Sequence, residues 1–311
     1  DILPPGENGN ATLVDILANQ ALGLQPPHAS DQLDRYAALA TGHQGLTDAQ
    51  LGRYFNDAAF GVPAGQVERV AQPRADVTIV RDRATGVPHI TGTTRAGTMF
   101  GAGYAGAQDR LFLMDLLRHV GRGQLTSFAG GAEGNRELEQ SLWRSAPYTD
   151  ADLQAQVDAL RASGPRGQLL FDDVQGYLAG VNAYIAACMA TRSCPGEYVL
   201  TGHLDAVTNA GGPQPFQPTD VVAIAGLIGG LFGGGGGAEM TSALVRVAAR
   251  ARYGPDAGDQ VWRALRAQND QETVLTLHDG QSFPYGQAPA DAPSVVLPDP
   301  GTAAPVPVVA D

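Results

Sequence analysis

Charged side chains lie inside an otherwise apolar segment of this sequence, and they are the first residues whose types and spacing could do chemistry. Asp109, Asp115 and Arg118 stand among leucine, phenylalanine, methionine and valine residues between positions 104 and 120. A buried charge is costly unless an opposite charge pairs with it. Asp115 and Arg118 are three residues apart, so they can pair on one face of a helix. We interpret these charges as a structural ion-pair and capping network, and a direct catalytic role is the alternative.

The common signatures of nucleophilic, metal-dependent and nucleotide-dependent enzymes do not occur in this sequence. It contains no GxSxG, no HExxH, no GxxxxGK[ST] and no dinucleotide fingerprint after a strand. The six histidines are scattered, and we interpret His89, in a predicted strand, and His119, in the apolar segment, as structural. The sequence therefore shows no nucleophile together with its base.

The elements that must position these charges follow from the hydrophobic pattern. Alternation at Val77, Ile79 and Arg81 predicts a strand, and Gly86 can supply the positive φ of a turn into a returning strand. Residues 104–120 predict a helix that is apolar on several sides.

Further along, three more helices are expected. Residues 172–188 follow the i, i+3, i+4, i+7 pattern, and an apolar helix over 220–231 has Thr219 or Asp220 as its cap. Five glycines interrupt the regular structure before a helix over 239–253, which Gly254 and the following proline end.

Composition excludes some classes of partner. The net charge is −12 and all 20 basic residues are arginine, without a basic stripe, so we expect no nucleic-acid binding. No apolar run is long enough for membrane insertion. The spacing of Cys188 and Cys194 leaves a disulfide and two free thiols equally open.

Several motifs occur in an order that resembles one known family. They are Arg81-Asp82, Gly86 to Ile90, Phe100 to Tyr104, Ala107 to Phe112, and the later segments GYLAGVNAYI, QPFQPTDVVAI and WRALRAQNDQET. Together they resemble the α subunit of penicillin acylases, which are N-terminal-nucleophile hydrolases. The resemblance covers residues 76–286. A helical N-terminal extension, 1–75, precedes it, and a Pro/Ala-rich tail near the processing site, 287–311, follows it.

The resemblance implies a fold, a partner and an activity. The fold would be α+β, a mostly helical α subunit that completes an αββα sandwich with a separate β chain from the same self-cleaving precursor. The N-terminal serine of the β chain would be the nucleophile, so no catalytic residue is expected here. Substrates would be N-acyl compounds such as β-lactams, acyl-homoserine lactones, lipopeptides or N-acyl amino acids. We expect a secreted or periplasmic protein, and this location favours the Cys188–Cys194 disulfide.

The resemblance also carries over four site residues. Gly229, Phe232 and Gly233 match acyl-pocket positions, and Glu239 matches a ligand of a calcium ion whose other ligands come from the β chain. Alternatively, Glu239 only caps the N-terminus of a helix, where the helix dipole favours a negative charge. Penicillin G acylases carry bulkier side chains at the first and last pocket positions, so we hypothesise a longer or bulkier acyl group. β-chain residues that refill the space are the rival explanation, as is a need for glycine's backbone freedom.

Two functions from other classes remain open. One is a catalytically inactive homologue that binds a ligand or a partner, and the other is a stand-alone helical secreted structural domain. The first residue of a partner chain would separate the hydrolase from the inactive homologue.

Overall fold

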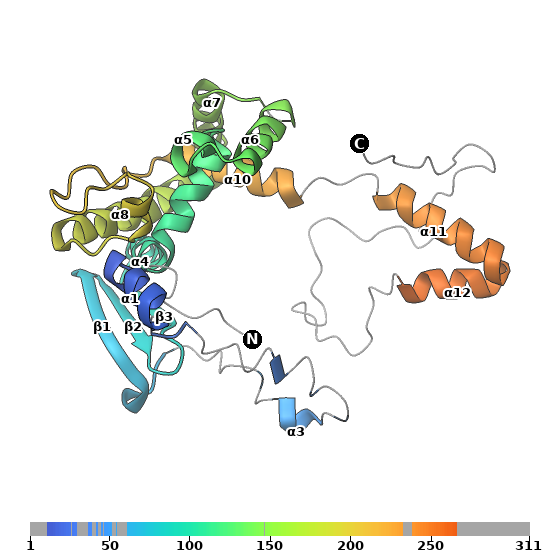
Figure 1. Ribbon diagram of the computed structural model, residues 1–311, viewed down its shortest axis with the longest axis horizontal. Coiled ribbons are helices and arrows are strands. Elements are labelled where there is room, and N and C mark those ends of the chain that lie inside the picture. Colours follow the sequence, from blue (N-terminus) through green and yellow to red (C-terminus); the bar gives the residue numbers. More distant parts are fainter. Residues whose placement is uncertain are drawn as a thin grey trace. The chain divides into compact units, whose positions relative to one another are not determined.

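Figure 1 shows a computed structural model of the 311-residue chain. The structure describes residues 11–25, 27–29, 37–38, 42, 45, 47–51, 54, 61–145, 147–232 and 238–265. The chain divides into two compact units, Asp1–Gly230 and Leu231–Asp311, and each is described by itself. Helices predominate among the described residues and a small antiparallel sheet accompanies them, which confirms the α+β class. The sandwich with a second chain stays a prediction.

The sheet of the first unit contains three strands within the described residues. They are β1 (Val67–Arg74), β2 (Val77–Asp82) and β3 (Pro88–Gly92), antiparallel and in the order β1-β2-β3. β2 is central, and every second side chain is buried, beginning with Val77. Ile79 pairs with Ile90 of β3, and Gly86 has a φ of 69° in the turn between these strands, as the sequence predicts.

Strand β1 was not predicted, because its own sequence carries little strand signal. It lies inside residues 1–75, where the pattern indicates only helices. Its residues are mostly exposed or half-buried, with Val70 59% exposed, so no apolar alternation marks it. The strand forms through its hydrogen bonds to β2, as an edge strand that tolerates Pro73.

Two long helices form the centre of the first unit. They are α4 (Arg95–Gly121) and α8 (Pro165–Thr191). Their backbones meet at glycines, because a Cβ added at Gly180 would lie 1.9 Å from the Phe100 carbonyl oxygen. A Cβ at Gly103 would lie equally close, 1.9 Å from the Tyr177 carbonyl oxygen. Both sites therefore require the smallest residue.

The first unit also contains shorter helices. They are α5 (Leu125–Ala129), α6 (Glu133–Ser145), α7 (Asp150–Ala162), α9 (Glu197–Leu200), and, earlier in the chain, α1 (Leu13–Leu22), α3 (Asp48–Leu51) and the 3-10 turn η2 (Ala64–Gln66). The main core contains Leu111, Phe128, Leu178, Val181, Ile185, Tyr198, Leu204 and Phe216. A disulfide joins Cys188 to Cys194 within this core. None of the described helices is both long and apolar enough to span a bilayer.

The N-terminal helices agree with the sequence where the structure describes them. Thr12 caps α1 in a reciprocal capping box with Asp15, and α3 begins directly after Thr47. Residues 31–42 of the predicted helical extension lie largely outside the described residues.

Three predicted helix starts are wrong. α8 begins at Pro165 and not at position 172, because Gly164 and a proline in the first turn start the helix before its apolar pattern appears. α4 begins at Arg95 and not at position 104, because Thr94 caps it with a hydrogen bond to the Gly97 N–H and the glycine-rich first turns hide the apolar pattern. α10 (Pro218–Phe232) begins at Pro218, so Thr219 and Asp220 lie inside its first turn. Proline suits the first helical position because it lacks the N–H that would be unpaired there.

The second unit contains a helical hairpin in its described part. α11 (Ala238–Tyr253) ends as predicted at Gly254, whose φ is 83°, and α12 (Pro255–Leu265) follows at once. The buried Trp262 indole donates to the Ser242 carbonyl at 3.0 Å, which holds the two helices together.

Candidate functional site

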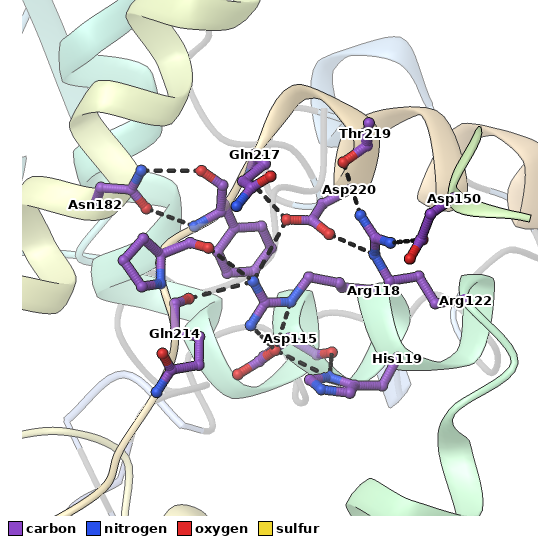
Figure 2. A network of polar contacts seen from close by, with 12 residues as sticks. Asp115, Arg118, His119, Arg122, Asp150, Asn182, Gln214, Gln217, Thr219 and Asp220 are labelled. Carbon is purple, nitrogen blue, oxygen red and sulfur yellow. Dashed lines mark hydrogen bonds and ion pairs between the residues drawn. The ribbon is translucent and has the colours of Figure 1, made fainter. Parts of the chain in front are cut away.

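A network of buried charges lies where the end of α4 meets the start of α10 (Figure 2). α4 supplies Asp115, Arg118 and His119, and Arg122 follows directly as its C-terminal cap. The first turn of α10 supplies Asp220. This network therefore lies at the N-terminal end of the predicted acyl-pocket helix.

Arg118 is the centre of the network and is only 6% exposed. Its Nη2 lies 2.5 Å from Asp115 Oδ1, so the predicted i, i+3 pair is confirmed. Its Nη1 donates to the carbonyl oxygens of Gln214 and Pro215, each at 3.2 Å, and lies 3.4 Å from Asp220 Oδ2. The guanidinium also stacks over the Phe216 ring, 4.0 Å from its centroid.

Asp115 is 1% exposed, yet its surroundings favour the charged form. Burial by itself raises the pKa of this carboxyl. The hydrogen bond from His119, the charge of Arg118 and the hydrogen bond from the Tyr198 hydroxyl, at 2.8 Å, outweigh burial and hold the pKa below its ordinary value. Asp115 is therefore an ionised acceptor, which suits a structural anchor better than a proton donor.

Asp220 connects the two arginines through its two oxygens. Arg122 Nε donates to Oδ1 at 2.7 Å, and the backbone N–H of Gln217 donates to Oδ2 at 2.7 Å. Arg122 also donates to the Thr219 hydroxyl at 2.7 Å and pairs with Asp150 at the start of α7. The network thus fixes the N-terminal turn of α10 against the end of α4.

A second buried ion pair joins α4 to the sheet. Arg81 of β2 is 1% exposed, and its Nη2 lies 2.7 Å from Asp109 Oδ1 and 2.8 Å from Gln108 Oε1. α4 leaves helical geometry at Arg110, where φ is −144°, directly after these two residues. Asp82 accepts hydrogen bonds from Thr85 and Val87, which closes the turn. The charged residues of the Arg81-Asp82 motif and of the Ala107 to Phe112 motif therefore make structural contacts.

These contacts support positioning and not proton transfer. Asp109, Asp115 and Asp220 are each paired with arginine. The rings of His119 and His203 both stack on the Phe128 ring, with centroid distances of 4.0 and 4.5 Å. Both cysteines of the sequence are in the disulfide, so neither is a thiol nucleophile.

The predicted acyl-pocket residues lie at the C-terminal end of α10. A Cβ at Gly229 would meet no heavy atom within 4 Å, so the space around it is open in this chain. Phe232 is the last residue of α10 and is 84% exposed. Gly233 lies outside the described residues. Gly229 and Phe232 thus share a helix whose opposite end is held by the charge network.

Glu239 lies in the first turn of α11, in the second unit. Within the described part of the chain, no group of three or more histidine, cysteine, aspartate or glutamate residues could hold a metal ion. A calcium ion takes six to eight oxygen ligands, so most of them would have to come from elsewhere.

Sequence reasoning missed the role of Asp220. The residue reads as a helix cap, and its contacts with Arg118 and Arg122 lie 102 and 98 residues apart in the chain. One signal was available in the sequence. Near the end of the apolar segment, arginines outnumber acidic residues, so a further carboxylate is needed to pair with them. Nothing in the sequence indicates which carboxylate completes the set.

The comparisons with known proteins agree on one family. A family model described as penicillin amidase matches residues 76–288. Penicillin G acylase of Escherichia coli is 26% identical over 200 residues, covering 63% of this chain and 21% of that protein. Penicillin acylase 2 proenzyme of Pseudomonas sp. is 28% identical over 159 residues, covering 51% of this chain and 18% of that protein. The acyl-homoserine lactone acylase PvdQ of Pseudomonas fluorescens is 28% identical over 165 residues, covering 50% and 20%.

A solved structure is also similar. It is a thermostable penicillin G acylase from Alcaligenes faecalis, with 27% identity and a TM-score of 0.42, covering 68% of this chain and 98% of that one. The chain spans about a fifth of the length of the curated relatives it matches, with 21%, 18% and 20% of their residues covered.

Proposed function

We propose, because this chain belongs to the penicillin amidase family, that it is the α subunit of a two-chain amide hydrolase that removes the acyl group from an N-acyl substrate. The observation that carries the proposal is the family match over residues 76–288. The relatives named as acylases support amide hydrolysis, and the relative named as a proenzyme supports a processed precursor.

In this proposal the chain forms a wall of the acyl pocket and does not supply the nucleophile. The N-terminal serine of a β chain attacks the amide carbonyl, and its own α-amine accepts the hydroxyl proton. The α-amine passes this proton to the substrate nitrogen as the C–N bond breaks and the substrate amine leaves, and water then hydrolyses the acyl-serine ester. The described arginine–carboxylate pairs support this division of labour, because they leave this chain's buried acids neutralised.

The exposed end of α10 supports a partner chain. Ile228, Leu231 and Phe232 are 41%, 59% and 84% exposed, although they are large apolar side chains on one short segment. Covering such side chains removes apolar surface from water, which favours association. A β chain that covers this end would place its own residues beside Gly229 and Phe232.

Calcium and acyl preference belong to the same proposal. Glu239 would supply one carboxylate to a calcium ion, which would hold the two chains together, and the β chain would supply the other oxygens. The open space at Gly229 supports a pocket that takes an acyl group longer than phenylacetyl. A secreted or periplasmic location would fit the disulfide.

The test is N-terminal sequencing and intact-mass analysis of any polypeptide that co-purifies with this chain, followed by assays on octanoyl and phenylacetyl amides. A partner that begins with serine, threonine or cysteine, together with amide hydrolysis, is the expected result. A partner with another first residue and no hydrolysis would favour the inactive binding homologue. A folded monomer without a partner would contradict the proposal. A strong preference for phenylacetyl would contradict only the proposed acyl length.

A further inference from the structure

A cavity of about 400 Å³ lies beside α6, and none of its lining residues belongs to the charge network. Its lining residues are Thr126, Arg136, Glu139, Gln140, Trp143 and Arg144. All except Thr126 belong to α6, and their spacing places them along one side of that helix. The volume falls within the range of roughly 300–1,000 Å³ that is typical of small-molecule sites.

The cavity carries an excess of positive charge. Arg136 and Arg144 make no ion pair among the described residues, whereas Arg95 and Arg122 each bind a carboxylate. Arg144 has only a weak contact with Gln140, 3.4 Å from Nη2 to Oε1. The two arginines are eight positions apart, which is about 12 Å along a helix. In a protein whose net charge is −12, two guanidiniums that line one cavity without an ion pair among the described residues favour an anionic ligand.

Glu139 limits how much negative charge the ligand can carry. Its Oε2 accepts a hydrogen bond from the Thr126 N–H at 2.7 Å, so the carboxylate is held at the cavity wall. Two guanidiniums and one carboxylate leave a net charge of +1 on the lining residues. A monoanion suits this balance better than a phosphate dianion, which Glu139 would repel.

Trp143 supplies a fixed aromatic surface. Its indole N–H points at the Gly123 carbonyl oxygen, with a distance of 3.4 Å. Gly123 has a φ of 63°, and a Cβ there would lie 2.3 Å from Trp143 Nε1, so only glycine lets the indole lie against the backbone. The Trp143 residue remains 47% exposed. A planar ring can therefore stack on the indole while its anionic group reaches an arginine.

We propose that this cavity beside α6 binds a small aromatic carboxylate, with Arg136 and Arg144 holding the carboxylate and Trp143 stacking on the ring. The site lies on residues separate from the acyl-pocket helix α10. Its existence does not depend on the proposed hydrolase activity.

The experiment is a calorimetric titration of the purified chain, with any partner that co-purifies, using benzoate as the probe. Neutral benzamide and inorganic phosphate are titrated in parallel. The variants are the double substitution Arg136→Gln/Arg144→Gln and, as a matched control, Arg166→Gln on the exposed start of α8. Tryptophan fluorescence of the native protein and of Trp143→Phe gives a local readout, since Trp262, the other tryptophan of this chain, is buried in α12.

Saturable benzoate binding is expected, with affinity about tenfold weaker in the double variant and unchanged in Arg166→Gln. Benzoate should quench a fluorescence component that Trp143→Phe lacks, and benzamide should bind more weakly than benzoate. The proposal is overturned if benzoate does not saturate the native protein, if the double variant binds it equally well, or if benzamide binds as tightly. Phosphate that binds more tightly than benzoate would also overturn it. Benzoate bound only in the acyl pocket would leave the double variant unaffected.

Discussion

At the scale of single residues, Asp115 joins three partners inside the core, and we predict that its charge is needed for stability. In Asp115→Asn the buried Arg118 loses its nearest carboxylate. Asp220, 3.4 Å away, is then its remaining charged partner, and its other acceptors are backbone carbonyl oxygens. Breaking a buried pair from one side costs about 3 kcal/mol of unfolding free energy. Urea denaturation of the native and variant proteins measures this loss.

Asp150→Asn is the control for that prediction, because it belongs to the same network but its side chain is 84% exposed. Exposed pairs contribute little, so its effect should be much smaller. Equal losses of unfolding free energy in the two variants would show that burial does not increase the contribution of Asp115 to stability.

The same residue predicts a pH dependence. Burial raises the pKa of Asp115, but the combined effect of His119, Arg118 and Tyr198 is larger and lowers it. The folded-state pKa therefore lies below the ordinary 3.8. The unfolded chain therefore binds the proton first, and the contribution of Asp115 is present above that value and is lost as the pH falls through the folded pKa. The difference in unfolding free energy between the native protein and Asp115→Asn should be full at about pH 7 and smaller at about pH 3. A difference that grows on acidification would contradict the lowered pKa.

Only the contacts between residues close together in the sequence could be predicted for this network. The pair of Asp115 and Arg118 could be predicted, because a helix brings residues three apart together. The contact between Arg122 and Asp220 could not, since 98 residues separate them and many carboxylates were equally eligible. The acyl-pocket positions Gly229 and Phe232 were carried over from a resemblance, and the structure places them without testing their role.

At the scale of elements, the network holds the N-terminus of α10, and we predict that Asp220→Asn loosens this helix alone. The substitution removes the charge that Arg118 and Arg122 share, so the first turn of α10 loses its anchor. Hydrogen exchange measured by mass spectrometry should rise over 218–232 and remain unchanged over α8. Thr219→Val removes only one hydrogen bond of Arg122 and should have a smaller effect. Uniformly faster exchange throughout the unit would indicate general destabilisation instead.

The close contact between α4 and α8 leads to a prediction about glycine. In Gly180→Ala the new methyl group would lie 1.9 Å from a backbone oxygen of α4, so the helices must separate, at a cost of roughly 1–3 kcal/mol or more. Gly134→Ala in α6 is the matched control, because its Cβ meets nothing within 4 Å and alanine favours a helix. Thermal unfolding should show a lower midpoint for the first variant and an unchanged or higher midpoint for the second. A destabilised Gly134→Ala would contradict the assigned open space.

Prediction of the elements succeeded where a helix or strand buries one face of its own pattern. β2 and the 172–188 part of α8 do so, and both were predicted from their periodicity. β1 is an exposed edge strand that is stabilised by its hydrogen bonds to β2. The first turns of α4 contain glycines, whose lack of a side chain allows close packing against α8. Such elements depend on partners that a sequence pattern does not identify.

At the scale of the whole molecule, the exposed apolar end of α10 is the feature that this chain does not account for by itself. Leu231 is 59% exposed in the penultimate position of α10, and a covering β chain would bury it. Leu231→Asp would place a charge in that interface, and desolvating an unpaired carboxylate costs more than the contact gains. We therefore predict that the variant recovers less of the co-purifying partner in size-exclusion chromatography. Leu200→Asp, at a residue 58% exposed on α9, is the control and should retain the partner. Equal loss in both variants would indicate a general effect of exposed aspartate, and full retention in Leu231→Asp would place the partner on another face of the chain.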